Sequence, residues 1–274
     1  MTETIRITPE DRVFVLTGAG GSAESGLKTF RDQGGLWEGH RLEDVATPEA
    51  WQEDPARVWR FYSQRRRDAR QAQPNPAHRA LADLERAIGD RLFLCTQNVD
   101  DLHERAGSRR LVHMHGELFA SRCENSPLAP QRLGAACERP PFADDALYES
   151  GAAIPHCTCG GRIRPHIVWF GEIPLEMERI EREIARSTIM LVVGTSGAVY
   201  PAANFVRWAG PKVRKYYIGP GGSDERERIY PPRDGSCRRS VARIAGSGMS
   251  SATPPHAGEA SPSGLRASGQ SRRS

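Results

Sequence analysis

The sequence has no long apolar run. No stretch approaches the roughly 20 apolar residues that a membrane-spanning helix requires, and the N-terminal residues MTETIRITPEDR contain no apolar segment of the signal-peptide type. We therefore expect no membrane partner and a cytoplasmic location. With 274 residues, of which 38% are hydrophobic, the chain can still bury a sizeable core in one or two domains.

The chain also has little cysteine, and its pattern does not suit a disulfide framework. Of six cysteines, Cys157 and Cys159 are separated by one residue, which is more typical of a metal site in a reducing compartment. Tetrahedral zinc takes four thiolate or imidazole ligands, usually from two closely spaced pairs. The other pair is irregular, because Ser126 stands at the expected spacing after Cys123, and Cys137 is the available substitute if the intervening residues loop out. The sequence thus predicts a structural zinc on Cys123, Cys137, Cys157 and Cys159, with a metal-free module of buried thiols as the alternative.

The body of the chain lacks an excess of either charge. Residues 220–274 contain nine arginines, no lysine and five acidic residues, a surplus that equals the net charge of +4 of the whole chain, so residues 1–219 are formally neutral. The same tail has few large apolar side chains, too few to offset the entropy of ordering it, and we expect it to be disordered. A basic tail on a neutral body gives little reason to expect a nucleic-acid partner.

A glycine-rich turn follows the first strong strand pattern. Residues 13–16 are apolar and rich in β-branched and aromatic side chains, and Gly18-Ala19-Gly20-Gly21-Ser22-Ala23 comes directly after them. This pattern predicts a buried strand, a tight turn and a helix start. Glycine lets the backbone approach a pyrophosphate, whose charge is attracted by free N–H groups at a helix start. The G-x-G-x-x-A spacing fits a dinucleotide site, although a plain strand-to-helix turn is an open alternative.

Further strands and helices alternate along the chain. We expect strands over residues 92–95, 111–114, 189–193 and 213–218, and helices over residues 55–72, 77–88, 102–106, 175–186 and 202–209. This order predicts an α/β fold, a Rossmann-like parallel sheet with helices on both faces. Between residues 119 and 165 the sequence changes to Cys, Pro and Gly with little periodicity, which indicates an inserted small module.

Three motifs occur together in a characteristic order. They are GAGGSAESGLKTFR, TQNVDDLH and HGE, followed by RPHIVWFGE at residues 164–172 and GTS at residues 194–196. In this order and at this separation they resemble the sirtuin family of NAD-dependent protein deacylases, from about Arg12 to Tyr200. The resemblance implies a catalytic domain over residues 1–219, with a disordered tail over 220–274. Its Rossmann-like part would comprise 1–35, 77–118 and 165–219, and its small zinc-binding and helical module 36–76 and 119–164.

The resemblance implies that NAD is consumed. The acyl-lysine oxygen would attack the nicotinamide ribose as nicotinamide leaves, and a histidine would activate a ribose hydroxyl, giving O-acyl-ADP-ribose and free lysine. His115 stands at the family's catalytic position. Imidazole suits the task, since a pKa near 6.5 leaves it largely neutral at cytoplasmic pH. A buried structural histidine is the alternative, and His113 has no role in this scheme.

The resemblance also assigns the residues that bind NAD. Asn98 and Asp100 match contacts to the nicotinamide ribose and carboxamide, although either could instead cap the helix that follows. Lys28 replaces the proline usual in the flexible cofactor loop. The cofactor-binding set is Gly18, Ala19, Gly20, Ser22, Ala23, Glu24, Thr29, Phe30, Arg31, Trp37, Gln97, Asn98, Val99, Asp100, Gly194, Thr195 and Ser196.

Two segments are assigned to the substrate, the acylated lysine side chains of proteins. Val168, Trp169, Phe170 and Gly171 lie in a segment that would pair with the substrate peptide as an added strand, or else form a plain core strand. Tyr62 and Arg65 form the Tyr-x-x-Arg motif by which class III sirtuins bind succinyl-, malonyl- or glutaryl-lysine. The alternative is that residues 65–67 are a solvated basic face.

Two other functions are compatible with parts of the sequence. A dehydrogenase would share the glycine turn, but its next strand should end in an acidic residue about 20 positions on, where this sequence is helical and Trp-rich. A catalytically weakened or non-catalytic protein that binds NAD or acyl-lysine is a second alternative, because the tail lacks the elements that complete the adenine end of the site in sirtuins. We expect a monomer.

Overall fold

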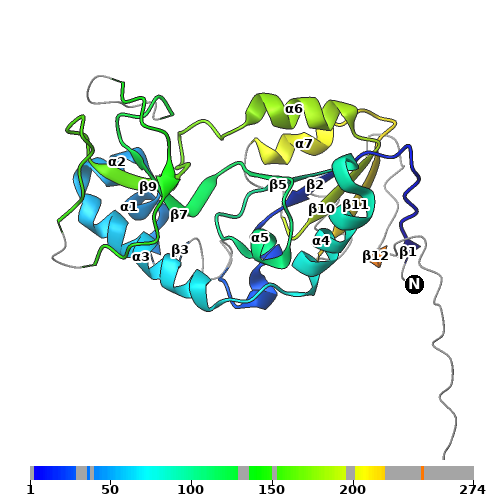
Figure 1. Ribbon diagram of the computed structural model, residues 1–274, viewed down its shortest axis with the longest axis horizontal. Coiled ribbons are helices and arrows are strands. Elements are labelled where there is room, and N and C mark those ends of the chain that lie inside the picture. The colour runs from blue at the N-terminus through cyan, green and yellow to red at the C-terminus, as the bar shows by residue number, and fades with distance from the viewer. Residues whose placement is uncertain are drawn as a thin grey trace, which may run out of the picture.

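The computed structural model describes residues 3–28, 36–37, 40–128, 136–149, 153–195, 201–219 and 242–243. Its centre is a five-stranded parallel sheet with the strand order β11-β10-β2-β5-β6 (Figure 1). The strands are β2 (Val13–Thr17), β5 (Leu92–Thr96), β6 (Leu111–His113), β10 (Ile189–Val193) and β11 (Arg214–Ile218). The predicted Rossmann-like parallel sheet is therefore confirmed.

The sheet is buried on both faces because its strands are continuous apolar runs. Phe14 and Leu16 of β2 point to one face, where they pack against α6 (Met177–Arg186) and α7 (Ala202–Trp208). Val13 and Val15 point to the opposite face, where they join α4 (Pro76–Ile88) in a second apolar cluster. A short helix, α5 (Leu102–Ala106), contacts α4.

Three helices begin in the same way, with a polar N-cap followed by proline. Asn75 caps α4 and accepts from the backbone of Ala77 and His78. Asp54 caps α3 (Pro55–Gln71), and Thr47 caps α2 (Pro48–Glu53). Proline at the first helical position has no N–H to leave unsatisfied, and its φ already suits a helix. These local signals are why the helix boundaries agree well with the sequence.

The two predicted insertions pack into one small module. Its sheet has the order β8-β7-β9, formed by β7 (Gly116–Cys123), β8 (Phe142–Ala143) and β9 (Ile163–Ile167). Its helices are α1 (Leu42–Val45), α2 and α3. Trp51, Trp59 and Tyr62 from the helices share one core with Leu118 and Ile163 from the sheet. In Figure 1 this module lies at the end of the parallel sheet away from β11.

One face of α3 is buried although it is rich in arginine. Arg66 is fully buried, donates to the carbonyls of Leu118 (2.8 Å) and Ala146 (2.6 Å), and lies 3.5 Å from an Asp144 oxygen. Arg65 is also buried, with 8% of its surface exposed. The alternative of a solvated basic face is therefore wrong for these two arginines.

Two local predictions are corrected. The chain after β2 does not begin a helix directly but forms two short 3-10 turns, η1 (Ala19–Gly21) and η2 (Ala23–Ser25), and a third, η3 (Gly89–Arg91), precedes β5. Residues 168–172 form a turn after β9, so the alternative of a plain core strand is wrong: the Glu172 side chain accepts from the Trp169 N–H at 2.8 Å and closes the turn.

The remaining strands are short. β1 (Glu3–Thr4) pairs in parallel with β12 (Ala242–Arg243), and β3 (Leu36–Trp37) pairs with β4 (His40–Arg41). The rest of the tail predicted to be disordered lies outside the described residues. Within the described residues, no helix combines the length and apolar character needed to cross a bilayer.

Candidate active site

The predicted site residues gather at one edge of the parallel sheet. Gln97 and Asn98 follow β5, and His115 follows β6. Gly18 follows β2, and Gly194 follows β10. In open α/β sheets, ligands bind at the carboxyl ends of the strands. This edge is therefore the candidate active site.

The glycine turn is fixed by a neighbouring loop. A Cβ on Gly18 would lie 2.7 Å from the Thr195 Cβ, and a Cβ on Gly20 would lie 2.7 Å from the Gly194 oxygen. The Gly18 and Gly20 amides donate to Val193 and Gly194 oxygens at 3.0 and 2.8 Å. The glycines are thus required by close contact with the end of β10. These two N–H groups are engaged within the protein, and the Gly21 and Ser22 N–H groups at the start of the 3-10 turns donate to the Gly18 and Ala19 carbonyls, which corrects the expectation of free N–H groups for a phosphate at this position.

A buried polar network lies beneath this turn. The Asn98 amide donates to Ser22 Oγ at 3.0 Å, and Ser22 Oγ donates to Asp100 at 3.1 Å. The Leu102 N–H also donates to Asp100, so this carboxylate supports the start of α5 as well as the network. Burial raises the pKa of Asp100. The network fixes the Asn98 amide and the Asp100 carboxylate relative to the glycine turn.

Two buried histidines support the network and were not predicted from the sequence. His78 Nε2 lies 3.4 Å from Ser22 Oγ, and its pKa is lowered by burial. His103 Nε2 lies 3.1 Å from Thr17 Oγ1, and burial lowers its pKa to about 3. Their rings are 4.7 Å apart. Only the N-terminal position of His78 in α4, after Asn75, could have signalled its role, because its Nδ1 accepts from the Asn75 N–H.

Gln97 connects the ends of three strands. Its side-chain amide donates to Thr195 Oγ1 at 3.0 Å and to the Thr17 oxygen at 3.3 Å, while its own carbonyl faces His115. Val99 accepts from the Leu118 N–H at 2.8 Å, which ties the same loop to the small module. The 97–99 loop is therefore held from both sides.

His115 has the state that a general base requires. Its Nδ1 lies 3.2 Å from the Gln97 carbonyl, which can only accept, so Nδ1 carries the proton and Nε2 is left as the acceptor. Burial lowers the pKa of His115, and the bond to Gln97 only partly offsets this. The ring is therefore neutral near pH 7. A histidine in this form can take up a proton.

Tyr62 and Trp169 meet beside this edge in the small module. The Trp169 indole donates to the Tyr62 hydroxyl at 3.1 Å, and both side chains are buried. Burial raises the pKa of Tyr62, while the nearby Arg65 charge opposes that rise. Phe170 is exposed, and the Val168 N–H donates to the His115 carbonyl at 2.9 Å. The substrate segment is thus connected directly to the strand end that carries His115.

The four predicted cysteines converge at the base of the small module. All their sulfur atoms lie within 4.8 Å of one another, with 3.4 Å between Cys123 and Cys159 and 3.7 Å between Cys137 and Cys157. Four sulfurs at about 2.3 Å from a tetrahedral zinc would be about 3.8 Å apart. Backbone N–H groups lower the pKa of Cys157 to about 6 and also lower that of Cys159, which favours thiolates at these two positions, whereas burial raises the pKa of Cys123. The geometry and the donor set therefore fit a structural zinc ion.

The remaining predicted residues vary in how much is described. Ala19, Ala23 and Glu24 are exposed in the 3-10 turns, and Gly171 is exposed with φ +88°. Thr29, Phe30, Arg31 and Ser196 lie outside the described residues. The backbone of Trp37 is described, but its side chain is not.

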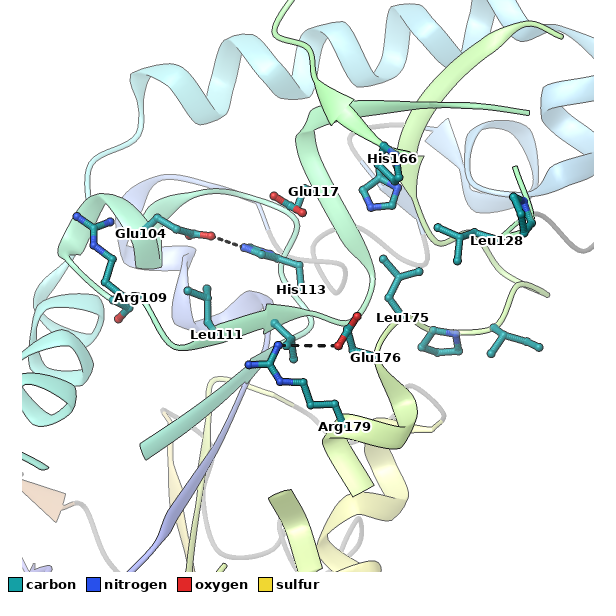
Figure 2. A pocket seen from close by; sticks show the side chains of 16 residues that line it. Glu104, Arg109, Leu111, His113, Glu117, Leu128, His166, Leu175, Glu176 and Arg179 are labelled. Carbon is teal, nitrogen blue, oxygen red and sulfur yellow. Dashed lines mark hydrogen bonds and ion pairs between the residues drawn. The ribbon is translucent and has the colours of Figure 1, made fainter. Parts of the chain in front are cut away.

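A pocket of about 820 Å³ lies beside β6, between the parallel sheet and the small module (Figure 2). Glu104 and His113 line it from the parallel-sheet side, and Glu117 and His166 line it from the small module. Leu128 contributes to an apolar wall. His113, the last residue of β6, therefore lies at a junction between the two parts of the molecule.

Comparison with known proteins agrees with this geometry. The sequence model of the Sir2 family matches residues 18–201. An NAD-dependent protein deacylase of Salmonella typhimurium is 47% identical over 238 residues, which cover 83% of each chain. One of Caulobacter vibrioides is 49% identical over 206 residues, covering 71% of this chain and 78% of the relative. Among solved structures, a Sir2 homolog in complex with NAD has a TM-score of 0.68 and 37% identity, over 86% of this chain and 84% of the other. This chain belongs to the Sir2 family.

Proposed function

We propose that this protein removes acyl groups from protein lysines, with NAD as co-substrate, and that it prefers acyl groups that end in a carboxylate. The observation that carries the first part is the neutral, half-buried His115 at the carboxyl edge of the sheet. The deacylase names of its relatives support it. NAD supplies a ribose carbon that accepts the acyl oxygen as nicotinamide leaves.

The residues of the chain have separate tasks in this reaction. His115 takes a ribose hydroxyl proton on Nε2 while the Gln97 carbonyl holds its ring. Asn98 and Asp100, fixed by Ser22, contact the nicotinamide ribose and carboxamide. The substrate peptide would lie against the turn at residues 168–172. Because the N–H groups of residues 168–170 and 172 donate within the protein, main-chain pairing there would rely on carbonyl oxygens, and such pairing accepts many peptide sequences.

The preference for acidic acyl groups rests on Tyr62 and Arg65. They lie three residues apart on α3 and hence on one face. Both are buried, so water does not screen the guanidinium. A guanidinium offers a planar fork of donors to a carboxylate, and the tyrosine hydroxyl adds a third donor. A charge-assisted hydrogen bond of this kind contributes about 1.5 to 3 kcal/mol.

The test compares succinyl- and acetyl-lysine peptides of one sequence. Arg65→Met should lower kcat/KM for the succinyl peptide by roughly 10- to 100-fold and leave deacetylation within a few-fold. Tyr62→Phe should act in the same direction but less strongly. Arg60→Met is the matched control, because Arg60 is an exposed arginine of the same helix. Equal losses on both peptides would mean that these side chains support the fold or a general lysine channel.

The alternatives differ in what the same assay detects. A dehydrogenase would produce NADH absorbance, and a binding module would release no nicotinamide. The comparisons do not support the alternative of a catalytically weakened protein. The relatives that match most of this chain are named as NAD-dependent protein deacylases. A cytoplasmic location and a monomeric state stay predictions.

A further inference from the structure

His113, the last residue of β6, takes no part in the proposed chemistry, yet it makes two strong hydrogen bonds. Its Nδ1 lies 2.8 Å from the Asn98 carbonyl, and its Nε2 lies 2.7 Å from Glu104 Oε1 (Figure 2). The His113 side chain is 7% exposed and that of Glu104 is 32% exposed. One ring therefore connects β6, α5 and the loop after β5.

The two partners determine the protonation state of the ring. A carbonyl and a carboxylate both accept hydrogen bonds, so His113 satisfies both only when both ring nitrogens carry protons. Burial works against this charge, but Glu104 and the Asn98 carbonyl outweigh it and raise the pKa of His113. The bond to His113 also lowers the pKa of Glu104, again against the effect of burial. Below the raised pKa of His113, the contact is an ion pair.

The bond to Asn98 lies next to the bond that holds the general base. His115 contacts the Gln97 carbonyl and His113 contacts the Asn98 carbonyl, so two histidines of one strand end hold successive peptide units. The Asn98 side chain then donates to Ser22. The Asn98 backbone is thus held at its carbonyl by His113 while its side-chain amide is held by Ser22, so the orientation of the amide depends on both contacts.

We propose that the Glu104–His113 ion pair positions the Asn98 loop for NAD binding. Both are positioning residues, because they act through Asn98. The inference rests on the proposed function only in taking Asn98 as an NAD contact. It does not require that deacylation occur.

The inference implies a dependence of NAD affinity on pH. His113 loses its second proton as the pH rises through its raised pKa, and one of its two bonds is then lost. Other ionisable groups act on the ring through charge: Glu117 on β7, His166 on β9, His103 on α5, and Asp100. Of these, Glu117 is a carboxylate that raises the His113 pKa, and it serves as the matched control.

The experiment measures the Kd for NAD by calorimetry from about pH 6 to about pH 9, together with Tm. Glu104→Ala removes the bond and should weaken NAD binding by roughly tenfold near pH 7. Glu104→Gln can donate its amide to the unprotonated Nε2 of a neutral ring, while Nδ1–H stays on Asn98. The Glu104→Gln protein should bind NAD with a Kd within a few-fold of the wild-type value. Its Kd should not rise at high pH as that of the wild type does. Glu117→Gln removes a charge near the ring but no hydrogen bond to it, so it should keep the wild-type affinity near pH 6 and shift the weakening of NAD binding to a lower pH.

Two results would overturn the inference. One is a Glu104→Ala protein that binds NAD as wild type does, whatever its Tm, since a purely structural pair would change stability alone. The other is a Glu104→Gln protein with the wild-type pH profile, a variant that also provides the test if the alanine protein does not fold. A wild-type protein that shows the expected NAD binding but no deacylation would contradict the proposed function and not this inference.

Discussion

Replacing Glu172 by glutamine should destabilise the protein far more than any exposed ion-pair substitution. Glu172 Oε1 lies 2.7 Å from Arg164 Nη1, and Oε2 lies 3.1 Å from Arg122 Nη2. The side chains of all three residues are 1 to 3% exposed. Burial lowers the pKa of Arg122 to about 9, which reflects the cost of its charge there. Without the Glu172 carboxylate, two buried guanidinium groups would lose the carboxylate that forms ion pairs with both of them.

The magnitude follows from known broken ion pairs. Removing one partner of a buried pair costs about 3 to 5 kcal/mol, and 1 kcal/mol shifts Tm by roughly 2 to 4 °C in a domain of this size. Glu172→Gln should therefore lower Tm by about 10 °C in thermal unfolding followed by circular dichroism. Glu172→Gln should also weaken the binding of peptide substrates, because the Glu172 carboxylate accepts a hydrogen bond from the Trp169 N–H in the 168–172 turn.

Glu178→Gln provides the control for this measurement. Glu178 lies 4.0 Å from Arg182, and its side chain is 96% exposed, so its loss should cost no more than about 0.5 kcal/mol. A Glu172→Gln protein with a Tm equal to that of the control would refute the reasoning that this buried cluster depends on its carboxylate.

Three further predictions concern metal, pH and the glycine turn. Protein purified without added metal should contain about one zinc per chain, and chelation should lower Tm; a well-folded protein with a ratio near zero would contradict this. The acidic limb of kcat/KM should have a midpoint below the usual histidine pKa of about 6.5, since burial lowers the pKa of His115 and the neutral form is the base; a midpoint above that value would exclude the assignment. Gly20→Ala should cost about 1 to 3 kcal/mol and weaken NAD binding, because its Cβ would meet the Gly194 oxygen at 2.7 Å, whereas Gly21→Ala, with open space around it, should not.

Elements set by local signals could be predicted well. The buried strands read as continuous apolar runs, and α3 and α4 are marked by a polar cap, a following proline and helical spacing. The convergence of Cys123, Cys137, Cys157 and Cys159 was also anticipated, although Cys137 comes from an irregular position. The remaining site residues were assigned through the Sir2 motifs, whose order along the chain matches that of the family.

Features that depend on distant contacts could not be predicted. The end of β10 engages the amides of Gly18 and Gly20 and replaces the expected helix start by 3-10 turns. Residues 168–172 form a turn because Glu172 binds both Arg122 and Arg164. No sequence pattern connects Glu172 with these two arginines. A single histidine carries no periodic pattern, so the roles of His78 and His103 appear only when the network is assembled.

The most direct test of the central claim is nicotinamide release from NAD, measured with and without a succinyl-lysine peptide. The account predicts release only when the peptide is present, with one nicotinamide formed for each lysine freed, and loss of this release in His115→Ala. Release without peptide, NADH formation, or an unchanged rate in His115→Ala would contradict it.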